Sequence, residues 1–196
     1  MGLPVPPVLI IAFNRPDSAR RVFSAVRAAK PAKLFLACDA ARPGKAGEAE
    51  RVAEVRALVD AVDWPCEVHT KFPESNLGSG LGVSSAITWF LGEAGEGVIL
   101  EDDCLPTPAF FRFAATMLER HRHDHRVATI TGSNMAPLAK LPGPMASVAS
   151  PPAGAGRRGG GRGRATGCSL SRFAPTSPGY GGCTPTRRAS FAGNSP

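Results

Sequence analysis

Strand-length apolar segments alternate with segments of helical period through the first 131 residues of this chain. The predicted strands are Val5–Phe13, Leu34–Cys38, Trp64–Phe72, Val98–Leu100 and Val127–Thr131. The predicted helices begin at Asp17 or Ser18 and then cover Gly47–Val62, Gly82–Leu91 and Ala109 to about His121. Parallel strands need crossover connections, which helices supply. The alternation therefore predicts a Rossmann-like α/β fold with a mostly parallel sheet flanked by helices on both faces.

The charge of the chain is divided unevenly along its length. Residues 1–143 contain 16 Lys and Arg and all 16 Asp and Glu, whereas residues 144–196 contain the other seven basic residues and no acid. The net charge of +7 therefore belongs to the last 53 residues, and it does not indicate a specific nucleic-acid partner for the first part. We predict one folded domain over residues 1–143 and a low-complexity, basic, disordered tail over residues 144–196.

Hydropathy and cysteine usage predict the location of the protein. No apolar run approaches the roughly 18 to 20 residues that a transmembrane helix needs, and the N-terminus has no secretion signal pattern. The five cysteines are scattered, without a CxxC pair, as is typical of reduced thiols. We expect a cytoplasmic protein, at most peripheral to the inner face of the membrane.

The candidate site begins with three consecutive carboxylates, Glu101, Asp102 and Asp103, which follow a short apolar strand in the sequence GVILEDDCLP. Adjacent carboxylates repel one another, and a divalent cation is a common way to neutralise them. Side chains alternate along a strand, so Glu101 and Asp103 are expected on one face and Asp102 on the other. The sequence therefore predicts a metal and diphosphate site, and the competing interpretation is a solvated acidic turn.

Other polar residues also follow predicted strands. Asn14 with Arg15, Asp39 and Asn76 come after the first three strands. The carboxyl ends of parallel strands meet at one edge of a sheet, where ligands bind in such folds. We therefore expect these side chains to lie close to the acidic triplet.

Several other patterns favour structural interpretations. The sequence HRHDH at residues 121–125 contains three histidines and an aspartate, but its position among arginines predicts a solvated helix end. The sequence NLGSGLG lacks the third glycine of a dinucleotide fingerprint, and no phosphate-binding P-loop sequence is present. His69 and the aromatic residues of the helices are expected to pack in the core. Glu101 and Asp103 could also serve a glycoside hydrolase, but nothing else in the chain predicts a sugar cleft.

The segments IIAFNRP, CDAARP, NLGSGLGVSSAITWF and ILEDDCLPTPAFFRF together resemble a known family over roughly residues 5–135. They resemble the bacterial GT-A nucleotide-sugar glycosyltransferases of the hemolysin-activation-like group, which are related to the N-acetylglucosaminyltransferase I type. The resemblance implies a GT-A fold and a nucleoside-diphosphate sugar as the donor, usually a UDP-sugar. The acceptor would be a glycan, a lipid or a protein, and the sequence does not identify which. It also implies a divalent metal cofactor, Mn²⁺ with Mg²⁺ as the alternative.

The resemblance also assigns roles to individual residues. Asp103 would bind the metal, and Glu101 and Asp102 would hold the sugar and ribose side or the waters of the metal. Asp39 would recognise the base, and Arg15 would offset phosphate charge. The chain departs from the family where Ala40 stands in place of glycine after Asp39. A second departure is the Gly78–Leu81 segment, which lacks a basic residue, so backbone amides would have to contact phosphate there.

The family continues into an aromatic segment resembling WGWATWRRAW and an acceptor region that supplies the catalytic base in inverting members. Writing that segment in GC-rich codons and reading one base later gives GAGRRGGGRG, which is the sequence at residues 154–163. We hypothesise a reading-frame change near residues 135–144. An alternate frame of the gene without WGWATW would contradict this hypothesis. The disrupted acceptor region leaves two predictions open: a metal-dependent glycosyltransferase, or an inactive truncated remnant that binds nucleotide sugar weakly or not at all.

Overall fold

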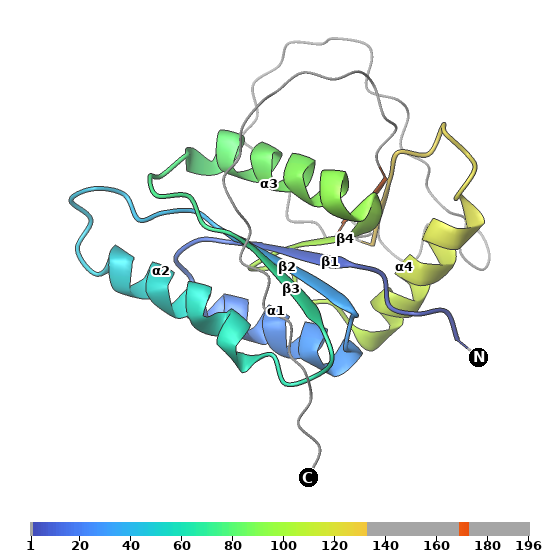
Figure 1. Cartoon of the computed structure of the whole chain (residues 1–196), viewed down its shortest axis with the longest axis horizontal. Coiled ribbons are helices and arrows are strands. Elements are labelled where there is room, and N and C mark those ends of the chain that lie inside the picture. The colour runs from blue at the N-terminus through green and yellow to red at the C-terminus, as the bar shows by residue number, and fades with distance from the viewer. Residues whose placement is uncertain (1, 133–168, 173–196) are drawn as a thin grey trace, which may run out of the picture.

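The computed structural model describes residues 2–132 and 169–172 and shows an α/β fold built around one sheet (Figure 1). Four parallel strands form its centre in the order β3–β2–β1–β4. Their bounds are Val8–Ala12 for β1, Lys33–Cys38 for β2, Glu67–Lys71 for β3 and Glu96–Glu101 for β4. In the register, Val8 of β1 is paired with Leu34 of β2 and with Val98 of β4. The predicted α/β class and parallel sheet are confirmed.

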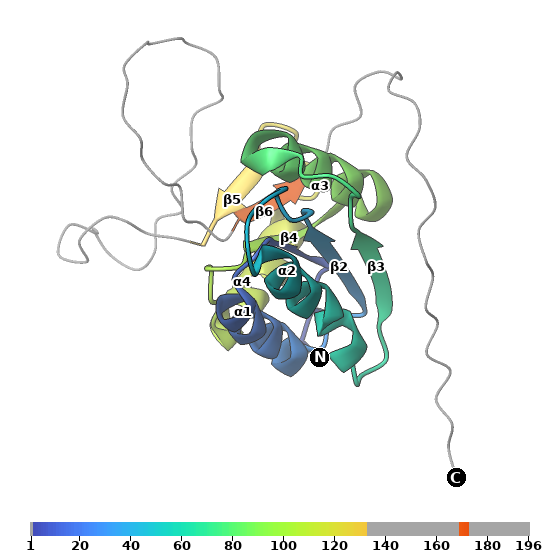
Figure 2. The ribbon, with the colours of Figure 1, turned by 90° about the vertical axis from the view of Figure 1, so that its left-hand side faces the viewer.

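Helices cover both faces of this sheet. Helix α3 (Gly78–Ala94) lies on one face, and α1 (Pro16–Ala29), α2 (Glu48–Arg56) and α4 (Pro108–Arg120) lie on the other (Figures 1 and 2). The chain passes from β1 to β2 to β3 in one direction, and α3 then returns it to β4 on the other side of β1. The strand order therefore reverses between β1 and β4, and such a switch point opens a crevice at the carboxyl ends of the strands.

The alternation of side chains along the strands builds two apolar cores. Val8 and Ile10 of β1 pack with α1, α2 and α4, whereas Leu9 of the same strand packs with α3. On the α3 face, Phe35 of β2 contacts Phe90 with ring centroids 5.0 Å apart. Both faces of the central strands are buried. Their sequences are therefore continuous apolar runs and do not alternate between apolar and polar residues, as is typical of parallel sheets.

The ends of several elements differ from the sequence prediction. Strand β3 begins at Glu67 and not at Trp64, because the Trp64 indole packs against Phe23 and donates a hydrogen bond to the Pro31 carbonyl oxygen at 2.9 Å. Helix α3 begins at Gly78, four residues before the predicted start. Helix α2 ends at Arg56 and continues as a 3-10 turn, η1 (Ala57–Ala61).

The strand predicted at Val127–Thr131 is present in a shorter form in the outer part of the sheet, next to a strand that was not predicted. Strand β5 (Thr129–Thr131) pairs antiparallel with β6 (Ser169–Arg172), and β6 pairs antiparallel with β4. Strand β6 lies within the predicted tail and was not predicted from the sequence. The domain boundary at residue 143 and the frame-change segment at residues 135–144 lie outside the described residues.

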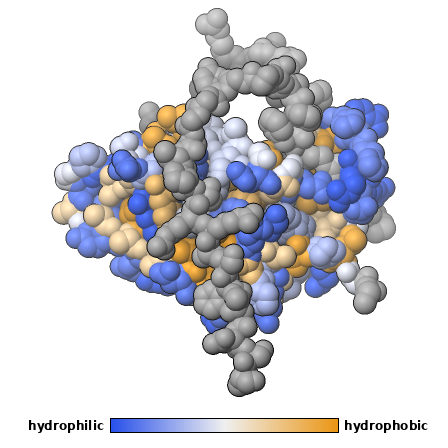
Figure 3. Space-filling model, viewed as in Figure 1, coloured by the Kyte–Doolittle hydropathy of each residue, from blue (hydrophilic) through white to orange (hydrophobic). Residues whose placement is uncertain are grey.

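The surface of the described part is mixed in polarity. Figure 3 shows hydrophilic and hydrophobic side chains interspersed on the visible face. The large apolar side chains that remain exposed are those of Leu3, Leu81 and Leu105. None of the described helices combines the length and apolar character that crossing a membrane requires.

Candidate functional site

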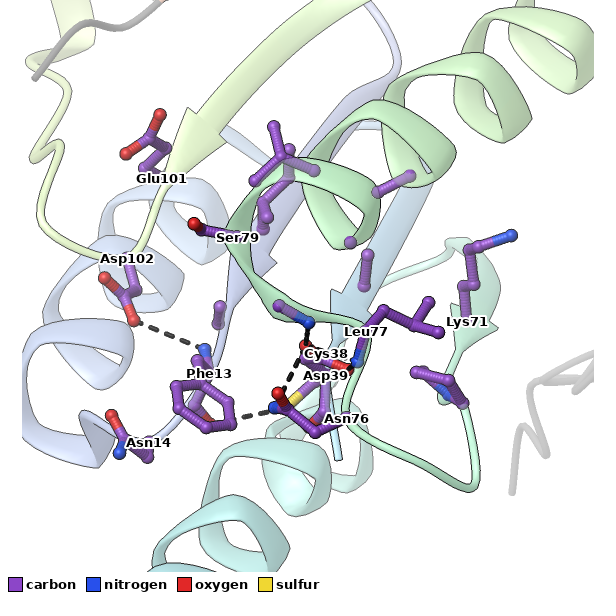
Figure 4. Close-up of a pocket in the computed structure, with 18 of the residues that line it drawn as sticks. Phe13, Asn14, Cys38, Asp39, Lys71, Asn76, Leu77, Ser79, Glu101 and Asp102 are labelled. Atoms are coloured by element: carbon purple, nitrogen blue, oxygen red, sulfur yellow. Dashed lines mark hydrogen bonds between the residues drawn. The ribbon is translucent and has the colours of Figure 1, made fainter. Parts of the chain in front are cut away.

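A cavity of about 410 Å³ lies at the carboxyl edge of the parallel sheet. Its walls come from the segments that follow all four parallel strands and from the first turns of α3 (Figure 4). The lining includes the predicted residues Asn14, Arg15, Asp39, Asn76, Glu101, Asp102 and Asp103. The structure therefore brings the separate polar sites of the sequence into one cavity at the switch point between β1 and β4.

The acidic triplet forms one end of this cavity. Glu101 is the last residue of β4, and the chain turns directly after it, with the Cys104 backbone N–H donating to the Glu101 carbonyl oxygen at 3.0 Å. All three carboxylates line the cavity. Asp102 and Asp103 were predicted on opposite faces, but both contact Arg15 Nη1, because they lie beyond the end of β4, where strand alternation no longer applies.

Arg15 connects the loop after β1 to two of these carboxylates. Its Nη1 donates to Asp103 Oδ2 at 3.0 Å and to Asp102 Oδ1 at 3.4 Å. Asp102 also accepts a hydrogen bond from the Phe13 backbone N–H at 3.4 Å. The side chain of Asp102 is 11% exposed, that of Asp103 31% and that of Arg15 49%. Within the triplet, the Asp102 carboxylate is therefore the more buried and the Asp103 carboxylate the more accessible from the cavity.

Burial makes this end unfavourable for negative charge. The pKa of Glu101 is raised, first by burial and then by the neighbouring Asp103 and Asp102 carboxylates. Burial also raises the pKa of Asp102, and Arg15 and the Phe13 N–H oppose that increase. An ionised carboxylate with a raised pKa gains from a nearby cation. The triplet therefore favours binding of positive charge.

Asp39 lies in the opposite wall, just after β2, and holds the start of α3. Its carboxylate accepts hydrogen bonds from the Leu77 N–H at 3.0 Å, the Gly78 N–H at 3.0 Å and Asn76 Nδ2 at 3.1 Å (Figure 4). The N-cap residue Leu77 has an apolar side chain that cannot accept a hydrogen bond. The Asp39 carboxylate accepts from the amides at the start of α3 in its place. Asn76 Nδ2 also donates to the Ala40 carbonyl oxygen at 2.7 Å.

The alanine after Asp39 causes no backbone strain. The Ala40 N–H donates to Asp39 Oδ1 at 2.9 Å, which closes the turn. Lys30 is the one non-glycine residue with positive φ among those described, so Ala40 adopts a conformation open to any residue. The turn after β2 does not need glycine here.

A buried ionic network supports the rim of the cavity, and the sequence did not predict it. Glu48, the first residue of α2, is 1% exposed and accepts hydrogen bonds from Asn14 Nδ2 at 2.8 Å, the Arg42 N–H at 2.7 Å and Arg42 Nη2 at 2.6 Å. These bonds from Arg42 lower the pKa of Glu48 to about 2. Glu48 therefore fixes the loops after β1 and β2. In the sequence it is indistinguishable from an ordinary acidic residue in a first helical turn.

The remaining sequence patterns occupy structural positions. Asp124 of the HRHDH segment pairs with Arg126, with Oδ1 to Nε at 2.9 Å, just after α4. His69 is buried and stacks on Phe35 with ring centroids 4.4 Å apart. Cys38 lines the cavity, and burial raises its pKa to about 11, so its thiol stays protonated at neutral pH.

A cation at the acidic end would need ligands from outside the described residues. Within residues 2–132 and 169–172, no three His, Cys, Asp or Glu side chains are arranged to hold a metal by themselves. A cation at Asp103 would therefore take one or two carboxylate oxygens from the protein and the rest from phosphate and water, as Mg²⁺ commonly does. Carboxylate oxygens are donors of the type that Mg²⁺ and Mn²⁺ accept, and the cofactor stays a prediction.

No model of a known protein family matches this chain, and no curated protein matches it either. The fold and the cavity define its class: an α/β protein with a polar cavity at the carboxyl edge of a parallel sheet.

Proposed function

We propose that the cavity binds a nucleoside-diphosphate sugar, UDP-linked as the first candidate, through a divalent cation at the acidic triplet. The observation that carries this proposal is the meeting of three carboxylates and Arg15 with the loop at Asn76–Gly78 in one cavity. An anionic diphosphate needs positive charge beside it, and a cation at the triplet and the Arg15 guanidinium would both supply it.

The two ends of the cavity would bind different parts of the donor. Asp103, the more exposed of the two carboxylates that pair with Arg15, would bind the cation, and Asp102 would keep Arg15 in position. Asn76 and Asp39 would form the wall beside the base. Because the Asp39 carboxylate already receives the amides of α3, its contribution to base binding includes holding that wall in place.

The reaction we propose is transfer of the sugar from the diphosphate to an acceptor. The cation, when bound, would stabilise the negative charge that develops on the diphosphate leaving group. The chain's own residues would hold the diphosphate: Arg15 by charge and Asp103 through the cation. We assign no catalytic base, because the region that carries it in the resembling family has no counterpart in the described residues.

The proposed location is the cytoplasm. The described cysteines, Cys38, Cys66 and Cys104, are free thiols, as is usual for proteins in reducing compartments.

Asp103→Asn tests the assignment of the metal residue. The substitution keeps the size of the side chain and removes its charge, so we expect the affinity for UDP in the presence of Mn²⁺ to fall roughly 100-fold, about 2.7 kcal/mol. Isothermal titration calorimetry measures the change. Asp17→Asn, on a side chain that is 97% exposed on α1, is the matched control and should bind as the wild type does.

Wild-type affinity in Asp103→Asn would contradict the metal assignment. A product assay with UDP-sugars then separates the two functional predictions. Transfer or hydrolysis of the sugar would support a glycosyltransferase, and tight binding without turnover would select the inactive remnant.

A further inference from the structure

Arg15 pairs with Asp103, the residue that the proposed function assigns to the cation. Its Nη1 lies 3.0 Å from Asp103 Oδ2 and 3.4 Å from Asp102 Oδ1, so one guanidinium nitrogen bridges both carboxylates. We propose that Arg15 is an internal counter-ion that keeps free divalent cations off the triplet and releases Asp103 when a diphosphate arrives with its cation. This inference rests on the proposed function and adds a regulatory property to the same site.

The other basic residues of the cavity are engaged elsewhere. Arg42 is held by the buried Glu48 carboxylate, and the Lys71 ammonium lies 5.9 Å from the centre of the Trp89 ring. Among the described residues, Arg15 is therefore the basic side chain that pairs with the triplet. It balances one of three negative charges, and the remaining excess attracts a cation only weakly while Arg15 stays in place.

The Arg15 side chain is able to exchange partners. The side chain is 49% exposed. Arg15 supports the start of α1 through its backbone, whose carbonyl oxygen accepts a hydrogen bond from the Ala19 N–H at 3.0 Å, and not through its side chain. The side chain can therefore move without disturbing the helix. A diphosphate offers paired oxygens that match the two-pronged donor geometry of guanidinium better than two separate carboxylates do. Arg15 would turn to the phosphate, and Asp103 would become free for the cation.

This exchange predicts that cation and diphosphate bind cooperatively. Binding of either ligand breaks the Arg15–Asp103 ion pair, which opposes binding of the other. The coupling is reciprocal by thermodynamic necessity. Removing the guanidinium should have opposite effects on the two ligands: free cation should bind more tightly, and diphosphate should bind less tightly.

The experiment is a titration of Arg15→Gln with Mn²⁺ alone, in which electron paramagnetic resonance measures the free metal at low ionic strength. We expect the affinity for Mn²⁺ to rise about three- to tenfold over wild type, because an adjacent positive charge is lost at a partly exposed site. In a second titration with inorganic pyrophosphate, the factor by which pyrophosphate tightens Mn²⁺ binding should fall about fivefold or more.

Two variants control for net charge and for folding. Arg20→Gln removes the same charge from a side chain that is also 49% exposed and pairs with Asp17 and Glu54 on α1 and α2. It should leave Mn²⁺ affinity unchanged. Arg15→Lys keeps the charge and should stay within about twofold of wild type in Mn²⁺ affinity.

Mn²⁺ affinity in Arg15→Gln that is equal to or below that of wild type would overturn the inference. So would an equal increase in Arg20→Gln, because the effect would then follow net charge alone. The Mn²⁺ titration contains no nucleotide, so its failure is separate from failure of the proposed function, which would appear as wild-type protein that does not bind UDP with Mn²⁺.

Discussion

Gly97→Ala is expected to lower the free energy of unfolding by about 3 kcal/mol. A Cβ atom at this position in β4 would lie 2.4 Å from the Pro7 carbonyl oxygen and 2.5 Å from Phe90 Cζ. Neither neighbour can move away easily, because Pro7 O accepts the Val98 N–H at 2.8 Å and Phe90 of α3 is fully buried against the sheet. The strand next to the acidic triplet would therefore have to shift. Urea unfolding measures the change.

Gly92→Ala is the matched control for this prediction. Gly92 lies in α3, where a Cβ atom would meet nothing within 4 Å. Alanine favours the helix over glycine, so this variant should gain up to about 1 kcal/mol. If Gly97→Ala were as stable as the wild type, the close packing of α3 on β4 would be wrong.

Glu48→Gln is expected to lower the midpoint of thermal unfolding by roughly 5 °C or more. The carboxylate is buried and accepts from Asn14 and from Arg42, and an amide would turn an NH₂ group toward these donors. Glu54→Gln makes the same change on the same helix at a side chain that is 49% exposed, and it should shift the midpoint by no more than about 2 °C. Similar losses in both variants would contradict the buried network.

The loss in Glu48→Gln should depend on pH in a defined direction. Contacts with Arg42 lower the pKa of Glu48 from its ordinary 4.5 to about 2. The unfolded chain takes up a proton as pH falls below about 4.5 while the folded protein keeps the carboxylate, so the stabilisation is complete above that pH and disappears toward pH 2. The difference between wild type and variant should therefore be constant from pH 6 to 8 and narrow below about pH 4.5. A difference that stays constant down to pH 3 would contradict the assigned pKa.

The parallel half of the fold could be predicted from local pattern. Strands such as Lys33–Cys38 are buried on both faces and leave an unbroken apolar run, and the helices between them follow the helical period. Strand β6 could not be predicted, because its pairing with β4 and β5 depends on backbone contacts between distant segments. The early start of α3 was also missed, since Asp39, in the loop after β2, accepts its first backbone amides.

The location of the candidate site could be predicted from the rule that ligands bind at the carboxyl ends of parallel strands. Arg15, Asp39, Asn76 and the acidic triplet follow strands whose carboxyl ends meet, and they line one cavity. What these side chains contact could not be predicted: the bridging position of Arg15 and the buried Glu48 depend on distances between loops. The roles that the family resemblance assigns to these residues stay predictions, and the variants above test them one at a time.

We propose that a cation at the acidic triplet holds a nucleoside diphosphate in this cavity. Calorimetric titration of the wild-type chain with UDP, once with Mn²⁺ and once with the metal removed by a chelator, tests this proposal. We expect saturable binding with Mn²⁺ and an affinity at least tenfold lower without it, a difference of about 1.4 kcal/mol. Absence of UDP binding in the presence of Mn²⁺, or equal affinity with and without the metal, would contradict the claim.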